Sequence, residues 1–173
     1  EIGVTIDGAD AVDFAGKFLI KGGGGAHCRE KVICEASNSY VIVLADDLKL
    51  KKVREEYVVP VEVLPFAFGS LEKRFQTEFA DQLLDSKLRQ CPSGSGKIGP
   101  VVTDNGNFIF DLKFSEEVYL NPFDLDLRIR QHAGVIETGI FWRLPKRNLL
   151  IYTEAGKIIQ TNDFVSPANK RDL

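Results

Sequence analysis

The 173-residue sequence contains no methionine, not even at position 1, and only one tryptophan. Its first residues, Ile2 to Ile6, already alternate apolar and small side chains, which is the pattern of a β-strand. A sequence that opens inside a strand, without an initiating methionine, is typical of part of a longer chain. We therefore expect a fragment, or a chain whose N-terminal portion is missing.

Cysteine is also scarce. The three cysteines, Cys28, Cys34 and Cys91, are odd in number, and no two of them have the Cys-x-x-Cys spacing. This content argues against a disulfide framework and against a zinc site. It favours a reducing compartment, and we expect a cytoplasmic protein.

Long apolar runs and an excess of positive charge are missing as well. No run approaches the ~20 residues of a membrane span, and the net charge of −3 gives no basic footprint for nucleic acid. With 44% hydrophobic and 27% charged residues, the composition is that of a soluble globular protein. We expect one domain, or one domain with a subdomain, without a membrane or nucleic-acid partner.

Glycine, in contrast, is concentrated at one place. Four consecutive glycines, Gly22 to Gly25, stand between Lys21 and a charged segment that is predicted to be helical. Glycine permits positive φ and leaves no Cβ between backbone N–H groups and a ligand. Such a turn at a helix start suits an oxyanion, an enediolate or a phosphate. Glu30 falls in the first helical turn, where an acid or base could transfer protons beside that site. The alternative is a tight turn in which the helix dipole favours Glu30.

Acidic side chains cluster after the first predicted strand. Asp7, Asp10 and Asp13 lie within seven residues. In open α/β sheets, ligands bind beyond the carboxyl ends of the strands. The cluster therefore favours a functional loop, with a solvated loop as the alternative. The spacing of a calcium loop is absent, and we predict no metal site.

A second strand is predicted to end near the first. Residues 29–39 suit a helix, and the continuous apolar run at 40–45 indicates a parallel strand that is covered on both faces. Asp46, Asp47 and Lys49 follow it. We expect the two strand ends and the glycine turn to converge on one crevice. Val32, Ile33 and Ala36 are predicted to form one apolar face of this helix.

The middle of the chain predicts further strands and a helix. Residues 58–64, interrupted by Pro60, indicate an edge strand or a crossing segment. Apolar residues at every fourth position predict an amphipathic helix that opens at Gly69. Residues 91–100 are predicted to form a flexible loop. The apolar positions of this helix are Leu71, Phe75, Phe79 and Leu83, with Leu84 and Leu88 beside them.

A hairpin, a helix and a strand are predicted next. Residues 101–103 and 108–114 are joined through Asn105-Gly106, the sequence of a type I′ turn. Asn121 is a helix cap with Pro122 at the first helical position, and 135–141 is a strand. The predicted order strand–helix–strand–strand–helix–strand is that of a ferredoxin-like unit.

Together these elements predict an α/β fold. A Rossmann-like open sheet, formed by residues 1–59 and 141–173, receives an inserted ferredoxin-like α+β subdomain at 60–140. The strands predicted at 149–152 and 158–159 return to the first sheet.

Several motifs in a fixed order resemble the type A ribose-5-phosphate isomerases. The resemblance extends from Thr5 to about Ile159, and it implies an N-terminal portion with a phosphate-holding loop just before this chain begins. The motifs are Asp7-Gly8-Ala9-Asp10, Lys21-Gly22-Gly23-Gly24-Gly25-Ala26, Arg29-Glu30-Lys31, Pro60-Val61-Glu62-Val63-Leu64-Pro65 and Val102-Thr103-Asp104-Asn105-Gly106-Asn107.

The resemblance implies reversible interconversion of ribose 5-phosphate and ribulose 5-phosphate through an enediol(ate), in the non-oxidative pentose phosphate pathway. It implies no metal and no other cofactor, and a homodimer or homotetramer. Glu30 would be the general base, Asp7 would open the furanose ring, and Asp10 and Lys21 would hold hydroxyls and the oxyanion. The remaining substrate-binding positions would be Gly8, Ala9, Gly22, Gly23, Gly24 and Lys49.

Other functions remain open from the sequence. Sugar-phosphate-sensing domains of DeoR-type regulators share the implied fold and the Gly8-Ala9-Asp10 turn, and would bind without converting. A non-catalytic interaction protein is a third reading, against which Asp7, Asp10, Lys21 and Glu30 together argue.

Overall fold

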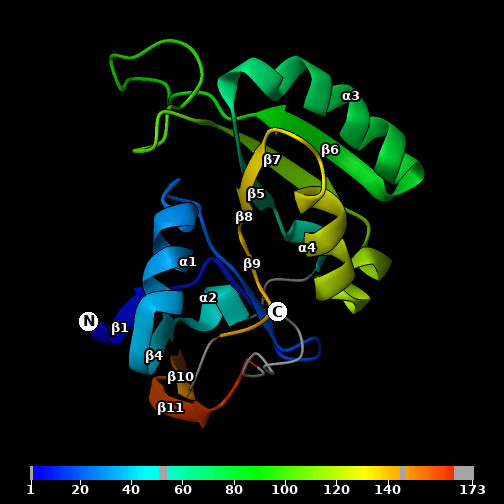
Figure 1. The fold of residues 1–173 in the computed structure, drawn as a ribbon. Coiled ribbons are helices and arrows are strands. Elements are labelled where there is room, and N and C mark those ends of the chain that lie inside the picture. The colour runs from blue at the N-terminus through cyan, green and yellow to red at the C-terminus, as the bar shows by residue number, and fades with distance from the viewer. Residues whose placement is uncertain (1, 51–53, 145–146, 166–173) are drawn as a thin grey trace.

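The computed structural model describes residues 2–50, 54–144 and 147–165 (Figure 1). It is a mixed α/β structure in three sheets, as the sequence predicts at the level of fold class. The first sheet has the strand order β1-β4-β10-β11, in which β1 and β10 both run parallel to β4, and β11 is antiparallel to β10. These strands are β1 (Ile2–Gly8), β4 (Ser37–Ala45), β10 (Arg147–Glu154) and β11 (Lys157–Asn162). The helices beside this sheet are α1 (His27–Ala36) and α2 (Asp47–Leu50).

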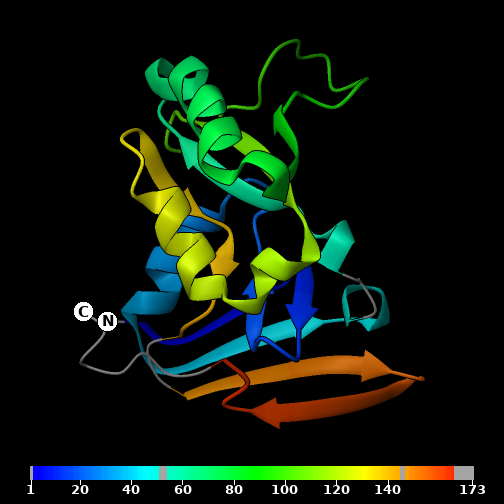
Figure 2. The same cartoon turned by 90° about the vertical axis from the view of Figure 1, so that its right-hand side faces the viewer.

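A small antiparallel sheet lies between the other two (Figure 2). It has the order β2-β3-β9, and its first two strands form a hairpin that sequence analysis did not predict. Each strand has only two or three residues, too few for an alternating pattern to be recognised in sequence. The strands are β2 (Ala11–Asp13), β3 (Phe18–Ile20) and β9 (Ile140–Phe141).

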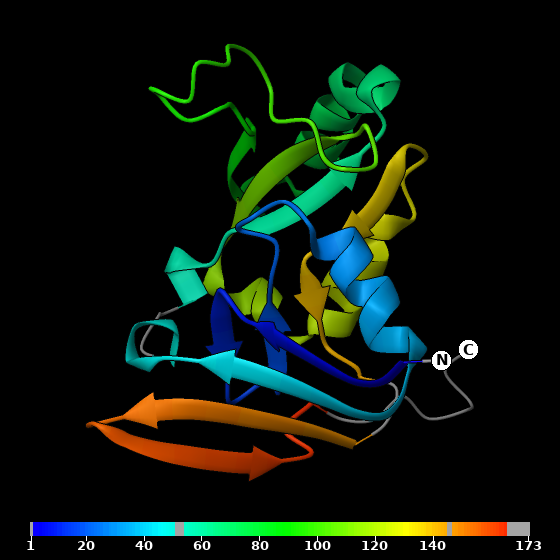
Figure 3. The same cartoon turned by 90° about the vertical axis from the view of Figure 1, so that its left-hand side faces the viewer.

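The third sheet is antiparallel throughout, with the order β6-β7-β5-β8. Its two helices cover one face, as the opposite views of Figure 2 and Figure 3 show. The elements are β5 (Val59–Val63), α3 (Phe68–Phe79), β6 (Leu83–Leu88), β7 (Phe108–Phe114), α4 (Pro122–Arg130) and β8 (Val135–Thr138). Short 3₁₀ turns occur at Arg54–Glu56, Pro65–Ala67, Ala80–Gln82 and Glu116–Leu120.

Two hydrophobic cores stabilise these layers. The larger lies between the third sheet and its helices, and includes Leu71, Phe75 and Phe79 of α3 against Phe110 and Phe114 of β7. The smaller lies on the inner face of the first sheet. Its members are Ala9, Val12, Leu19, Cys34, Val41, Val43, Phe141, Leu144, Leu150, Phe164 and Val165.

The opposite face of the first sheet is apolar but open. Val4 is 50% exposed, Ile6 63% and Leu44 43%. The pairing of Ile6 with Ile42, and of Ile42 with Leu149, places these side chains on one face. Parallel sheets normally have both faces covered. The prediction that the strand at 40–45 is covered on both faces is therefore wrong for the residues that the structure describes.

Two predictions about the first helix are also corrected. The helix ends at Ala36, and residues 37–39, predicted helical, begin β4. Its buried side chains are His27, Lys31 and Cys34, whereas the predicted face of Val32, Ile33 and Ala36 is exposed. The reason is that the buried Lys31 ammonium donates hydrogen bonds to Glu137 and to two backbone carbonyls, so that a charged side chain can occupy the buried face of the helix.

The segment 60–140 has the predicted element order, but two assignments were wrong. Leu83, Leu84 and Leu88 belong to strand β6, because α3 stops at Phe79. β6 replaces the strand predicted at 101–103, which forms no strand. The apolar spacing at every fourth residue continued past the helix end and concealed the change to strand.

Two further local predictions fail, while others hold. The segment at 58–64 is not an edge strand, because β5 is buried and lies between β7 and β8. Pro60 is tolerated there because the pairing of β5 with β8 starts at Val61. The 105–106 turn is not type I′, because only Gly106 has positive φ, at 79°. The Asn121 side chain does accept from the Asp124 amide at 3.2 Å to cap α4, and β10 and β11 do return to the first sheet.

Candidate functional site

The glycine turn connects β3 to α1 and needs its glycines. Gly22 and Gly25 have φ of 106° and 85°, and the Gly25 amide donates to the Gly22 carbonyl at 2.9 Å. A Cβ on Gly22 would lie 2.6 Å from His27 Nδ1, and one on Gly23 would lie 2.9 Å from Asp10 Oδ1. The turn therefore closes tightly against α1 on one side and against Asp10 on the other.

Lys21 is the centre of a charged cluster at the start of this turn. Its side chain is 4% exposed, and Nζ lies 2.8 Å from Asp7 Oδ2 and 3.2 Å from Glu30 Oε2. Nζ also donates to the Gly8 carbonyl and lies 5.7 Å from the centre of the Phe141 ring. Asp7, Lys21 and Glu30, predicted from β1, the glycine run and α1, are thus brought together.

Asp10 joins the cluster through the backbone. Its Oδ2 accepts a hydrogen bond from the Gly23 amide at 2.7 Å, and its own amide donates to the Ile20 carbonyl at 2.8 Å. The Asp7 carboxylate accepts from the Gly8 amide at 2.7 Å, and the Ala9 amide donates to the Leu44 carbonyl at 3.1 Å. These bonds fix the turn that follows β1, so that both carboxylates face the glycine turn.

Gly139 sets the position of Lys21 from the opposite side. The Lys21 amide donates to the Gly139 carbonyl at 2.9 Å, and the Gly139 amide donates to the Pro60 carbonyl at 2.7 Å. A Cβ on Gly139 would lie 2.1 Å from the Lys21 carbonyl oxygen. Only glycine lets β3 and the β8–β9 junction approach this closely.

Lys31, next to the predicted base, is part of the structure rather than the open site. Its ammonium donates to Glu137 Oε1 at 2.8 Å and to the carbonyls of Thr138 and Ile140 at 2.7 and 3.0 Å. Burial raises the pKa of Glu137, but the charge and hydrogen bond of Lys31 outweigh it and lower that pKa overall. All three ammonium donors are used, which holds α1 against β8 and β9.

His27 is buried at the start of α1. Its Nε2 lies 3.2 Å from the Glu137 carbonyl oxygen, and Nδ1 has no hydrogen-bond partner among the described residues. Burial lowers the pKa of His27 from its ordinary value. The ring therefore packs under the glycine turn in its neutral form, and it does not pair with Glu30.

In the sequence, Glu62 stands out only as part of the motif from Pro60 to Pro65. The structure shows a completely buried side chain whose Oε1 accepts from Thr103, Asn105 and Asn107 at 3.0, 2.9 and 2.8 Å. Arg29 of α1 then donates to Asn105 Oδ1 at 2.8 Å and to the Asp104 carbonyl at 2.7 Å. This network ties the 103–107 turn to α1, and no spacing in the sequence revealed it.

Arg89 and Asp111 were missed altogether. Arg89 at the end of β6 donates from Nε to Asp111 Oδ2 at 2.8 Å, and from Nη1 to the Gly22 and Gly23 carbonyls at 2.8 and 3.0 Å. The two residues lie 22 positions apart in sequence and meet only because β6 pairs with β7.

Lys49 and Asp46, which follow β4, lie outside the Lys21 cluster. Within the described residues, the ionic partner of Lys49 on α2 is Asp46, at 3.8 Å, and the ion pairs of Lys21 are formed with Asp7 and Glu30 instead. Asp46 caps the amides of Leu48 and Lys49. The chain passes directly from the end of β4 into α2, and neither Asp46 nor Lys49 forms an ion pair with Lys21 among the described residues.

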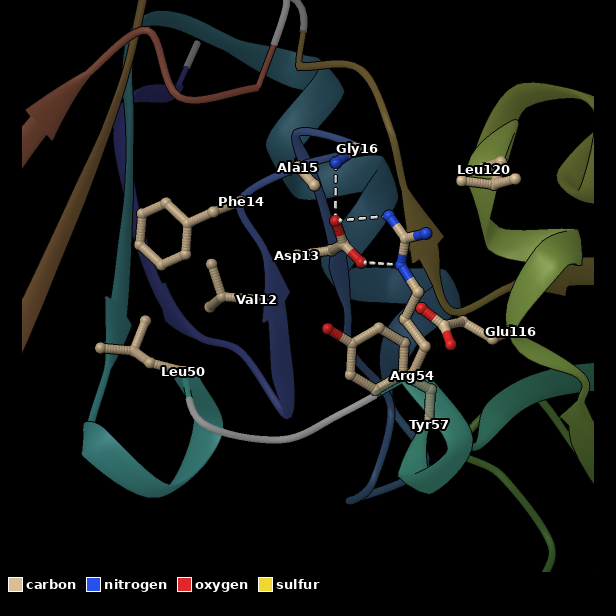
Figure 4. A pocket seen from close by; sticks show the side chains of 10 residues that line it. All are labelled: Val12, Asp13, Phe14, Ala15, Gly16, Leu50, Arg54, Tyr57, Glu116 and Leu120. Atoms are coloured by element: carbon tan, nitrogen blue, oxygen red, sulfur yellow. Dashed lines mark hydrogen bonds and ion pairs between the residues drawn. The ribbon is translucent and has the colours of Figure 1, made fainter.

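Asp13 belongs to a separate cavity of about 620 Å³ (Figure 4). It is 5% exposed and binds Arg54, with its Oδ2 2.6 Å from Nε and its Oδ1 3.1 Å from Nη2. Figure 4 shows this pair beside Tyr57 and Glu116, with Phe14 on another wall. The sequence predicted one loop cluster of three acids. The structure places Asp7 and Asp10 at the glycine turn and Asp13 in the ion pair with Arg54.

The chemistry available at the Lys21 cluster follows from its charges. A buried ammonium between two carboxylates, beside backbone N–H groups, can stabilise negative charge on a substrate oxygen while a carboxylate transfers a proton. Within the described ranges, no three His, Cys, Asp or Glu side chains are grouped to hold a metal ion. No described helix has both the length and the apolar character needed to cross a membrane.

Comparisons with known proteins agree on one family. The profile described as ribose 5-phosphate isomerase A (phosphoriboisomerase A) matches residues 1–156. A ribose-5-phosphate isomerase of Mycosarcoma maydis is 42% identical over 147 residues, 84% of this chain and 49% of its own length. One from Archaeoglobus fulgidus is 43% identical over 138 residues, covering 80% of this chain and 57% of the relative.

Solved structures give the same result. Ribose 5-phosphate isomerase A from Methanocaldococcus jannaschii matches with a TM-score of 0.78 and 33% identity, over 93% of this chain and 66% of that one. A D-ribose-5-phosphate isomerase in complex with phospho-erythronic acid matches with a TM-score of 0.77 and 36% identity, over 92% and 65% of the chains. The chain thus spans about half to two thirds of the length of these relatives.

Proposed function

Since the chain belongs to the ribose 5-phosphate isomerase A family, we propose that it interconverts D-ribose 5-phosphate and D-ribulose 5-phosphate. The reaction would serve the non-oxidative pentose phosphate pathway. The observation that carries the proposal is Lys21 Nζ, held 2.8 Å from Asp7 and 3.2 Å from Glu30 beside the glycine turn. This cluster combines a fixed cation with carboxylates that can move protons.

Glu30 is proposed as the general base. In the open-chain aldose, its carboxylate takes the proton from C2, and the electron pair forms the C1–C2 double bond of an enediolate, with negative charge on O1. Glu30 then returns the proton to C1. A proton also moves from the hydroxyl on C2 to O1, with Asp7 or solvent as the carrier, which leaves a hydroxyl at C1 and the carbonyl at C2. The start of α1 places this carboxylate on the same ammonium that would face O1.

Lys21 is proposed to stabilise the enediolate. Because it is almost fully buried, its charge is screened little by water. Asp7 lies on the other side of Lys21, where it can transfer hydroxyl protons and open the furanose ring. Asp10 and the amides of Gly22, Gly23 and Gly24 would bind sugar oxygens.

The remaining substrate contacts are proposed at the turn after β1, Gly8 and Ala9, and at Lys49. Lys49 pairs with Asp46 at the exposed start of α2, so binding there requires its side chain to exchange this partner. The complex of a solved relative with phospho-erythronic acid supports a sugar phosphate as the class of ligand.

We also propose a finer description of the fold. Residues 60–140 form a ferredoxin-like subdomain, supported by the sheet order β8-β5-β7-β6 and the antiparallel pairing. Residues 1–59 and 141–173 form a Rossmann-like part, supported by the parallel strands β1, β4 and β10.

The assembly and the compartment are proposals as well. A homodimer or homotetramer is expected from the family resemblance, and light scattering behind a sizing column measures it. A cytoplasmic location is favoured by the three free thiols. The relatives named above are isomerases, and none of them supports the DeoR-type sensor alternative.

A direct assay tests the activity. The 173-residue protein is incubated with ribose 5-phosphate, and ketose formation is followed with and without a metal chelator. We expect conversion that the chelator does not change and that phospho-erythronic acid inhibits. Folded protein that binds phospho-erythronic acid but forms no ketose would contradict the proposal.

A further inference from the structure

We infer that Arg89 is a positioning residue for the glycine turn, acting from the subdomain on the amides that face the substrate. The inference rests on the proposed function for its kinetic consequence. The guanidinium is only 16% exposed, and Asp111 holds it through both carboxylate oxygens. A bidentate Arg–carboxylate pair fixes the plane of the guanidinium. Nη1 is therefore directed at the turn, where it donates to two successive carbonyls.

The planarity of the peptide bond transmits this contact across the turn. In a trans peptide, the C=O and the N–H of the next residue point in opposite directions. With the Gly22 carbonyl bound to Arg89, the Gly23 amide points away from it, and it donates to Asp10 at 2.7 Å. The Gly23 carbonyl binds the same nitrogen, so the Gly24 amide is also directed away from Arg89.

The Gly24 amide is the group that this arrangement leaves available. It has no hydrogen-bond acceptor in the part of the chain that the structure describes, and a Cβ on Gly24 would meet nothing within 4 Å. A free donor in open space, one residue after the amide that binds Asp10, suits a developing oxyanion. A positive charge behind the two carbonyls also polarises the N–H groups on the other side.

Glycine makes this external support necessary. Glycine has more accessible backbone conformations than any other residue, so that four in succession do not hold one orientation by themselves. Asp10 binds the turn from the β1 side and Arg89 from the β6 side. Because Arg89 is on the subdomain, the same contact makes the geometry of the turn depend on how the subdomain packs.

The test compares two variants, Arg89→Lys and Asp111→Asn. Arg89→Lys keeps the positive charge but cannot form the bidentate guanidinium–carboxylate pair. Lys87→Met is the matched control, since Lys87 lies on β6, two residues before Arg89, in an exposed pair with Asp85. We expect Arg89→Lys to lower kcat at least about tenfold, with KM changed less than about threefold. Inhibition by phospho-erythronic acid should weaken along with kcat, and Asp111→Asn should move in the same direction. A purely structural role would change the folded fraction but not this KM-against-kcat split.

A second measurement does not depend on activity. Amide hydrogen exchange of Gly23, measured by NMR on the 173-residue protein, should accelerate at least about tenfold in Arg89→Lys and stay unchanged in Lys87→Met. An unchanged Gly23 rate in Arg89→Lys would overturn the inference. If the wild type forms no ketose, the proposed function fails, and the exchange result still decides whether Arg89 orders the turn.

Discussion

A buried ammonium is stable only with charged or hydrogen-bonded partners, and Lys21 has both. Asp7, Glu30 and the Gly8 carbonyl surround its Nζ. Nearby Lys31 is also buried, but its three donors are bound to Glu137 and to two backbone carbonyls. The two lysines contact the same Phe141 ring, yet only Lys21 lies beside the open glycine turn.

Replacing Lys21 should therefore affect catalysis more than binding. We expect Lys21→Met to lower kcat by about 10²–10³-fold, because one oxyanion donor and its charge are lost. KM should change much less. Steady-state kinetics with Lys73→Met, on the exposed face of α3, provide the control. Equal loss in both variants, or a loss confined to KM, would contradict the assignment.

The buried His27 makes stability depend on pH. Burial lowers its folded-state pKa below the ordinary 6.5, so the unfolded chain binds the proton more readily. The stabilisation is complete above about pH 6.5, and it is lost as the pH falls below that value, by at most about 1.4 kcal/mol per unit. Urea unfolding between pH 7.5 and 5.0 measures this slope. Glu137, whose pKa is lowered from 4.5, also stabilises the folded protein, but this stabilisation is lost only below about pH 4.5, outside the measured range.

His27→Gln should flatten that pH dependence. His132→Gln should flatten it less, because His132 is only half-buried, although burial also lowers its pKa. A wild-type slope that His27→Gln leaves unchanged would show that other groups cause it.

The structure brings Asp7, Asp10, Lys21 and Glu30 together, and their catalytic roles stay predictions. Asp7 and Asp10 follow a strand, and Lys21 and Glu30 flank a glycine run at a helix start, so local sequence carries their position. Glu62, Arg89 and Asp111 act through contacts between distant strands. Nothing in their own neighbourhood in sequence indicates those contacts.

At the level of secondary-structure elements, the close approach of β3 to the β8–β9 junction determines the position of Lys21. Gly139 lies where β8 ends and β9 begins, and its backbone contacts both Lys21 and Pro60. We expect Gly139→Ala to destabilise the protein by about 1–3 kcal/mol, since the methyl group meets backbone atoms that cannot move independently. Activity per folded molecule should also fall, because Lys21 is displaced.

Gly69→Ala is the control for that substitution. Gly69 is in α3, and an added Cβ meets nothing within 4 Å. Alanine should stabilise this helix by about 0.5–1 kcal/mol. Thermal melts and specific activities of the two variants make the comparison. Similar stabilities for both would mean that the approach at Gly139 is looser than the structure indicates.

Element boundaries were the least predictable part of the fold. Ser37 to Ser39 were predicted helical but pair with neighbouring strands, and Leu83 to Leu88 continue a helical spacing inside a strand. In both cases tertiary pairing overrides local preference. The capped start of α4 was predicted correctly, because Asn121 and Pro122 act within a single turn.

At the scale of the whole molecule, the site lies where three sheets meet. β1 supplies Asp7, β3 leads to Lys21, and Arg89 directly follows β6 of the third sheet. The order of elements was predictable from sequence, since apolar segments and turn residues alternate clearly. The β2–β3 hairpin and the contact of Arg89 with the glycine turn were not, because they depend on pairings that have no local pattern.

The open face of the first sheet has a measurable consequence. Val4 and Leu44 are 50% and 43% exposed on that face, and contiguous apolar patches bind hydrophobic dyes and other proteins. We expect the 173-residue chain to bind such a dye and to self-associate with increasing concentration. The double variant Val4→Thr with Leu44→Thr should reduce both while keeping strand preference.

Leu48→Thr serves as the comparison for the sheet face. Leu48 is 82% exposed and lies on α2, outside the strands of that sheet. Dye fluorescence and sedimentation of the three proteins give the result. If Leu48→Thr reduces dye binding as much as the double variant, the sheet face is not the responsible surface.

The most direct test of the central claim, that Glu30 moves the carbon-bound proton, is ribose 5-phosphate turnover in D₂O followed by ¹H NMR. The wild type should form ribulose 5-phosphate and incorporate deuterium at C1. Glu30→Gln should lose both by about 10²–10⁴-fold, while Glu35→Gln, an exposed residue of the same helix, should keep both. Deuterium incorporation at the wild-type rate in folded Glu30→Gln would contradict the claim.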